Sequence, residues 1–297
     1  MSTIASPSSS ILIPGIRPSF AGLVRSALRK IWYSRLTWIM LAICLAFTLI
    51  GFVLALQTTA SVAGQPIPAL ERLYIIASTP WFVTRALGGI IQMVITAYLI
   101  GIEYQRGTVR IILARGVGRI QLLLSQLTAV LIVGLLLLCG WAIIDTLGSF
   151  FIAQSAGVLK AANAEFWREM GLYLLTILIN MVITTLMAVA MAAIGRSLTF
   201  GMTAALSWFA ADNTIAFTLQ LLVASPHNNF FSKLTGYLLG PILNLLPQLI
   251  GLRQIPQQGN FASVSDGGTQ ALLIILAYGV LFLVVSLLVT WKKDIKE

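Results

Sequence analysis

Charged side chains are scarce in this sequence. Asp, Glu, Lys and Arg make up 9% of the 297 residues, whereas 58% of the residues are hydrophobic. Water-soluble domains carry about 25% charged residues, so this composition excludes a soluble globular protein. The apolar residues form long continuous runs, as expected of helices that cross a hydrocarbon core about 30 Å thick. We therefore expect an all-α integral membrane protein.

Residues that usually carry chemistry are also nearly missing. Cys44 and Cys139 both lie inside apolar runs, and His227 is the single histidine. Neither cysteine has metal-ligand spacing or an evident disulfide partner, and no set of His, Cys or paired carboxylates suggests catalysis. The sequence also lacks the Gly-rich Walker loop that binds nucleotide phosphates. We expect no metal, cofactor or catalytic residue in this chain, so that any ATP chemistry would belong to a partner chain.

The apolar runs predict six membrane spans within a transmembrane domain covering 37–292. We place the spans at about 37–57, 81–102, 120–152, 170–194, 198–224 and 270–291. The segment 225–268 contains a further apolar run, 234–252, but Gly and Pro residues interrupt it. Broken backbone at membrane depth must be covered by protein or line a cavity. We therefore expect 225–268 to be an extracytoplasmic segment with short helices that dip into the membrane, and no seventh span.

The segments at the two ends of the chain differ in character. Residues 1–18 are rich in Ser and Pro and predict a flexible tail. Residues 19–36 show helical periodicity, with apolar residues on one face and Arg25, Arg29 and Lys30 on the other. This pattern is typical of an amphipathic helix that lies in the membrane interface. Residues 293–297 are predicted to form a short second tail.

The positions of the positive charges predict the orientation of the spans. The net charge is +10, and most Lys and Arg residues lie at the ends of apolar runs. This distribution follows the positive-inside rule and argues against nucleic-acid binding. With six spans and a cytoplasmic N-terminus, 13 of the 19 Lys and Arg residues lie on inner segments. We therefore expect both termini and the segment 103–119 to be cytoplasmic, in a plasma or inner membrane.

The segment 103–119 holds four arginines and one glutamate between two spans. If it is helical, Glu103, Arg106 and Arg110 share one face. Gly107 would supply a bend or a close approach to another backbone, and Gly116 and Gly118 would end the element. The residues alone leave two interpretations open, a helix that docks a cytoplasmic partner or a solvated basic loop.

The stretch Glu103-Tyr104-Gln105-Arg106-Gly107-Thr108-Val109-Arg110, followed by 113–119, resembles the signature of type-2 ABC transporter permeases. The motif covers about twenty residues, whereas the topology is similar over nearly the whole chain. The resemblance implies a membrane subunit of an exporter that is surrounded by membrane lipids. It would pair with a second copy of itself or with a related permease, on two cytoplasmic ATPase subunits that bind ATP and Mg²⁺. It also implies that residues of this stretch and of the interfacial helix contact the ATPase, namely Glu103, Arg106, Gly107, Thr108, Arg110, Arg115, Arg119, Arg25 and Arg29.

Four polar residues lie within predicted spans, where charge is costly. Asp212 and Asn213 lie near the middle of the fifth span, and Asp145 and Arg85 lie in the third and second. Asp212 is either a substrate or ion contact or a structural hydrogen-bond partner. For Arg85 and Asp145 we predict an ion pair.

A competing function is an ATP-independent secondary transporter or channel that uses Asp212 or Asp145. The expected transport path is lined mostly by apolar residues, which favours a hydrophobic or amphiphilic cargo.

Overall fold

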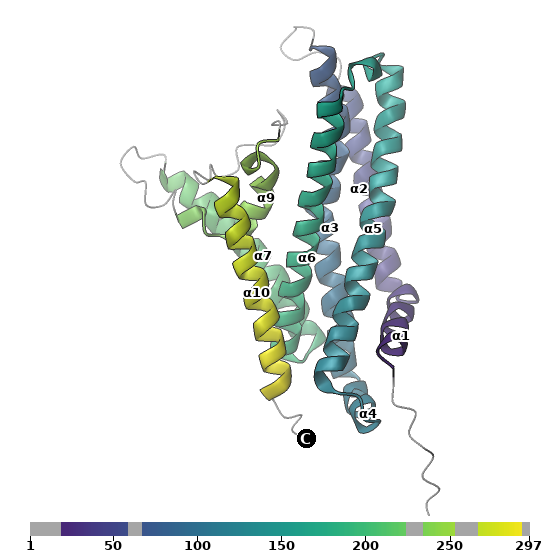
Figure 1. Cartoon of the computed structure of the whole chain (residues 1–297), viewed down its shortest axis with the longest axis vertical. Coiled ribbons are helices and arrows are strands. Elements are labelled where there is room, and N and C mark those ends of the chain that lie inside the picture. The colour runs from purple at the N-terminus through teal and green to yellow at the C-terminus, as the bar shows by residue number, and fades with distance from the viewer. Residues whose placement is uncertain (1–18, 59–66, 224–233, 253–266, 293–297) are drawn as a thin grey trace, which may run out of the picture.

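The computed structural model describes residues 19–58, 67–223, 234–252 and 267–292. Every regular element in these ranges is a helix (Figure 1), which confirms the expected all-α class. The predicted tails, 1–18 and 293–297, lie outside the described residues, as do parts of the predicted connections near 59–66, 224–233 and 253–266.

Four long helices form the main bundle. They run side by side in Figure 1 and comprise α2 (Arg35–Thr58), α3 (Ala69–Gln105), α5 (Arg119–Ser155) and α6 (Ala164–Gly195). The helix α3 is the most buried of the candidate membrane spans, and α2, α5, α6 and α7 (Leu198–Val223) all pack against it. A 3-10 turn, Leu159–Ala161, joins α5 to α6.

Two short helices mark one end of this bundle. The amphipathic helix α1 (Phe20–Trp32) packs on α5, and α4 (Thr108–Ala114) lies between α3 and α5. The last helix, α10 (Gly268–Lys292), ends on the same side (Figure 1). We call this side the α4 end and the side with the α5–α6 turn the far end. The predicted helix over 19–36 is confirmed as α1, which stops at Trp32 before α2 begins.

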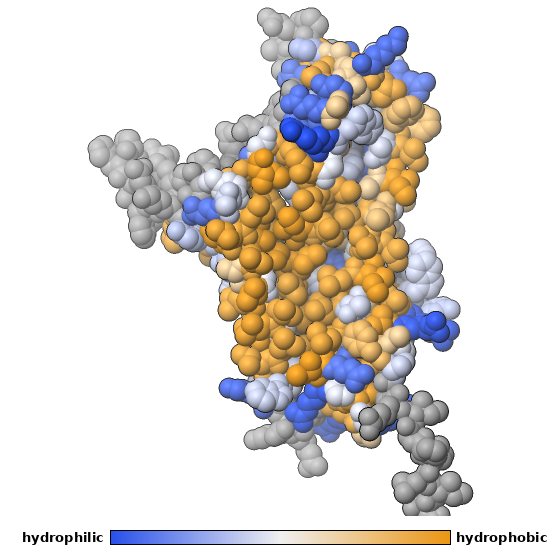
Figure 2. All heavy atoms as spheres, in the orientation of Figure 1, coloured by the Kyte–Doolittle hydropathy of each residue, from blue (hydrophilic) through white to orange (hydrophobic). Residues whose placement is uncertain are grey.

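Five of the described helices are long and apolar enough to cross a membrane: α2, α3, α5, α6 and α10. Figure 2 shows a broad apolar belt between two hydrophilic ends, the surface expected of a multi-pass membrane protein. The helix α7, predicted as the fifth span, is present but is not one of the five. Asp212 and Asn213 lie at its middle and lower its apolar character.

Two helices begin earlier than the sequence predicted. We expected α3 to start at about 81 after a polar connection, but it starts at Ala69 and contains Pro80. Proline lacks an N–H, which frees the carbonyl four residues earlier. That carbonyl, on Ile76, accepts a hydrogen bond of 3.3 Å from the Ser149 hydroxyl of α5. Likewise α6 starts at Ala164, because Asn163 caps it by accepting from the Phe166 N–H at 2.8 Å.

The broken segment before the last span contains one described short helix, α9 (Leu239–Leu249). It packs against α6, α7 and α10, and most of its side chains are buried. This confirms the expectation of a short helix in the segment. Whether it enters a membrane stays a prediction.

Glycine permits two close helix contacts at the α4 end. A Cβ on Gly101 of α3 would strike the backbone of Leu198, the first residue of α7. A Cβ on Gly201 of α7 would lie 2.9 Å from Ala192 Cα of α6. Small residues let helix backbones approach closely in membrane proteins. These contacts therefore set where α7 leaves the bundle.

Candidate functional site

A left-handed glycine separates α3 from α4. The helix α3 ends at Gln105, and Gly107 adopts φ +65° at the start of α4. A Cβ at Gly107 would meet nothing within 4 Å, so the glycine provides a bend and not a close approach. Gly116, at φ +84°, ends α4, and Gly118 caps α5. The expected short helix between two turns is confirmed.

Glu103 is the centre of the contacts at the α4 end. Its side chain is only 5% exposed and forms an ion pair with Lys30 of α1. Its second carboxylate oxygen accepts a hydrogen bond from the Gln126 amide of α5. The Thr108 hydroxyl of α4 donates to the Glu103 carbonyl at 3.1 Å. One residue of α3 therefore joins α1, α4 and α5.

The prediction that Glu103 shares a face with Arg106 and Arg110 is wrong. Glu103 points into the bundle, whereas both arginines are exposed. The reason is Gly107, whose left-handed conformation breaks the helical register between α3 and α4. Sequence reasoning placed Lys30 on the polar face of the interfacial helix but missed its pairing with Glu103, and it missed Gln126 altogether. The available signal for Gln126 was an amide inside an otherwise apolar run.

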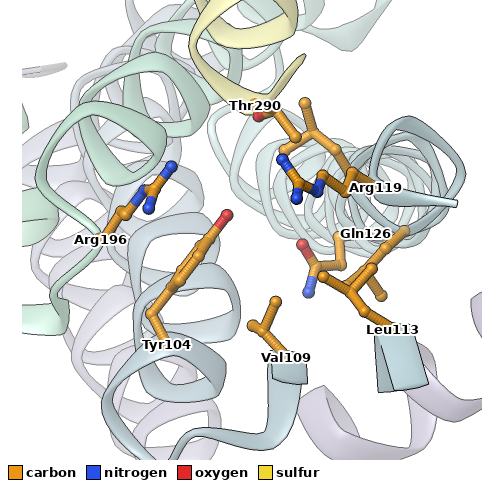
Figure 3. A pocket seen from close by; sticks show the side chains of 9 residues that line it. Tyr104, Val109, Leu113, Arg119, Gln126, Arg196 and Thr290 are labelled. Carbon is orange, nitrogen blue, oxygen red and sulfur yellow. The ribbon is translucent and has the colours of Figure 1, made fainter. Parts of the chain in front are cut away.

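The arginines of the segment fall into two groups. Arg106, Arg110 and Arg115 are exposed around α4, whereas Arg119 is half-buried. Arg119 lines a pocket of about 400 Å³, part of it open to the surroundings, together with Arg196 from the α6–α7 turn. Figure 3 shows the two guanidinium groups on either side of the Tyr104 hydroxyl. Arg196, which the site prediction omitted, adds a second positive group to this pocket.

Arg25 and Arg29 do not face α4. Both are exposed on the flank of α1 that borders α2 and α5. The opposite flank of α1 carries Lys30, which pairs with Glu103, and Leu23, which packs near Val109 of α4. The predicted docking residues therefore lie on two separate surfaces.

The predicted ion pair between Arg85 and Asp145 is wrong. Asp145 instead accepts a hydrogen bond of 2.8 Å from the Thr84 hydroxyl. Arg85 lies against the rings of Phe82 and Tyr173, at 5.6 and 5.5 Å from their centroids. Because Thr84 faces α5, the next residue is turned by about 100° around α3 and faces α6. Cation–π contacts replace the expected carboxylate partner.

Asp212 and Asn213 hold α9 against α7. The Asp212 carboxylate accepts a hydrogen bond from the Gly240 N–H in the first turn of α9. The Asn244 amide donates to the Asn213 side-chain oxygen at 2.7 Å. The N-cap residue of α9 is Leu238, whose side chain cannot accept a hydrogen bond. Asp212 therefore supplies the cap from another helix.

Replacement of Asp212 tests this capping role. We expect Asp212→Ala to lower the free energy of unfolding by about 1–2 kcal/mol, because a first-turn N–H of α9 loses its acceptor. Asp212→Asn keeps an acceptor oxygen and is expected to cost less than half as much. Thermal unfolding of the purified protein in detergent measures both. Equal losses for the two variants would contradict the capping role.

Among the described residues, no group of three or more His, Cys, Asp or Glu side chains could hold a metal ion. What the geometry offers is a short helix, α4, with exposed arginines on it and beside it, tied through Glu103 to the long helices α3 and α5 and to the short helix α1. A comparison of the sequence with protein-family models found no match, and a comparison with curated proteins found none either.

Proposed function

We propose that this chain is the membrane-spanning subunit of an ATP-binding cassette exporter, driven by a separate cytoplasmic ATPase. The observation that carries the proposal is the network around Glu103. A partner that pushes on α4 would act at once on α3, through the Thr108 contact, and on α1 and α5, through Lys30 and Gln126. A solvated basic loop whose charges only set the orientation of the spans would need no such contacts.

The surface around α4 suits a protein partner. Its exposed face carries Arg106, Arg110 and Arg115, together with the apolar side chain of Ile111, which is 57% exposed. Arginine and exposed apolar side chains are enriched in protein interfaces. In the proposed complex the α4 end is cytoplasmic, two copies of the chain pair with two ATPase subunits, and these subunits bind ATP and Mg²⁺. The cargo is hydrophobic or amphiphilic.

Charge reversal on α4 tests the proposal. The tagged chain is purified from its native membrane, and the ATP hydrolysis that co-purifies and is inhibited by vanadate is measured per mole of chain. We expect Arg106→Glu with Arg110→Glu to lower this activity at least about 10-fold, because two interface charges oppose the partner.

The matched control is Lys160→Glu with Arg168→Glu. It reverses two exposed positive charges at the far end and is expected to leave the activity unchanged. Wild-type activity in the α4 variant, at an unaltered melting temperature, would contradict the docking role. The absence of any vanadate-sensitive hydrolysis with the wild-type chain would contradict the proposal as a whole.

The alternative, an ATP-independent transporter, is favoured by one observation. Asp145 is buried in α5, and its Oδ1 atom has no hydrogen-bond partner among the described residues. A carboxyl group in such a position can bind and release a proton. Proton-driven uptake or efflux by the purified chain in liposomes, lost in Asp145→Asn and independent of ATP, would support this alternative.

A further inference from the structure

An apolar groove runs between α1, α2 and α5. It encloses about 1080 Å³, including the part open to the surroundings. Its walls are mainly aliphatic and aromatic, with Leu41 of α2 and Val133 and Leu137 of α5 along its length. It lies on the outside of the bundle, because Trp32, Trp38 and Leu136 among its lining residues are exposed. Such a groove is shaped and lined for a hydrocarbon chain.

One rim of the groove is positively charged. Arg25 and Arg29 both line it and are exposed. They are four residues apart on α1, so their side chains are neighbours on one flank. None of the residues that line the groove is acidic. Two guanidinium groups without a lining carboxylate form a site for an anionic oxygen group, such as a phosphate.

A pair of tryptophans fixes the junction between α1 and α2 beside this rim. The rings of Trp32 and Trp38 meet edge to face with centroids 5.2 Å apart, and the Trp38 indole N–H donates to the Trp32 carbonyl at 2.9 Å. Tryptophan is enriched where membrane hydrocarbon meets headgroups. The rings therefore mark the depth at which the charged rim and the apolar groove meet.

We propose that this groove binds one anionic phospholipid. Its phosphate lies between Arg25 and Arg29, and one acyl chain follows Leu41, Val133 and Leu137 into the groove. A free anion would not use the apolar walls, and a zwitterionic lipid would gain less from the two arginines. The inference rests on the membrane location of the chain and is independent of the proposed ATPase. It separates Arg25 and Arg29 from the contact surface around α4.

Lipid titration of the full chain tests the site. The chain is delipidated in dodecyl maltoside and titrated with dioleoyl phosphatidylglycerol, and one-to-one complexes are counted by native mass spectrometry. We expect Arg25→Gln with Arg29→Gln to weaken binding about 30-fold, or about 5.5-fold for each arginine. Dioleoyl phosphatidylcholine, which has the same chains, is expected to bind the wild-type protein weakly.

Two further variants separate the effect of the two arginines from that of net charge and from that of the apolar groove. Arg106→Gln with Arg110→Gln removes the same charge at the same end but leaves the groove untouched, so we expect wild-type affinity. Val133→Trp fills the groove but keeps both arginines, and we expect the one-to-one complex to be lost.

Three results would overturn the proposal. Equal weakening in both arginine pairs would mean that lipid binding follows net charge alone. Wild-type affinity in Val133→Trp would mean that the headgroup binds without the groove. The third result is that Arg25→Gln with Arg29→Gln loses the co-purifying ATP hydrolysis but still binds phosphatidylglycerol. The two arginines would then contact a protein partner and not a lipid.

Discussion

Replacing Glu103 with alanine is expected to destabilise the α4 end more than any substitution of its exposed arginines. The variant removes a buried carboxylate that pairs with Lys30 and accepts from Gln126. The Gln126 amide, itself buried, then lacks this acceptor. We expect a loss of about 2 kcal/mol in the free energy of unfolding, less than for a fully buried ion pair because the Lys30 side chain is 45% exposed. Thermal unfolding in detergent should show a melting temperature about 5 °C lower.

Glu103→Gln is the matched control for this prediction. It keeps an oxygen that can accept from Gln126 but removes the charge that pairs with Lys30, so we expect about half of the loss. In the proposed complex, Glu103→Ala should also keep the ATPase bound while lowering the transport achieved for each ATP hydrolysed. An unchanged melting temperature in Glu103→Ala would contradict the central place of this residue.

The second large effect is expected from Gly101→Ala. A methyl group at this position in α3 would strike the backbone of Leu198, and no side-chain rotation relieves a clash with backbone. We expect a loss of about 3 kcal/mol, because α7 must move away from the bundle. The measurement is again unfolding in detergent, combined with proteolysis to detect a displaced α7.

Gly140→Ala is the control of opposite sign. Gly140 is also inside a long helix, α5, but a Cβ there would meet nothing within 4 Å. Alanine favours helix over glycine by about 1 kcal/mol, so this variant should be neutral or slightly more stable. A similar loss in both variants would mean that the cost at Gly101 is a general effect of adding a methyl group to a long helix and does not come from its contact with Leu198.

The sequence predicted the helices of the main bundle better than their ends. Long apolar runs identify a span, but helix ends depend on local partners that composition does not reveal. The early start of α3 required Ser149, from another helix, to satisfy the carbonyl that Pro80 leaves free. The early start of α6 was visible in principle, because Asn163 is a good capping residue.

Side-chain directions were the weakest part of the prediction. We predicted the pairing of Arg85 with Asp145 only because the two residues lie at a similar depth in the membrane. In the structure Thr84 faces Asp145, and Arg85, one residue further along α3, faces Tyr173 of α6. The expected face of Glu103 failed for a related reason, because the conformation of Gly107 breaks the helical register. Both errors concern rotation about a helix axis, which depends on packing against neighbours.

The length of α5 has a mechanical consequence. It is a continuous helix of 37 residues that extends from the turn after α4 to the far end, or about 55 Å at 1.5 Å per residue. The hydrocarbon core of a membrane is only about 30 Å thick. Such a helix acts as a lever, in which a tilt of about 5° at the α4 end moves the other tip by about 5 Å. A small displacement of α4 could therefore be amplified across the whole membrane without any helix unfolding.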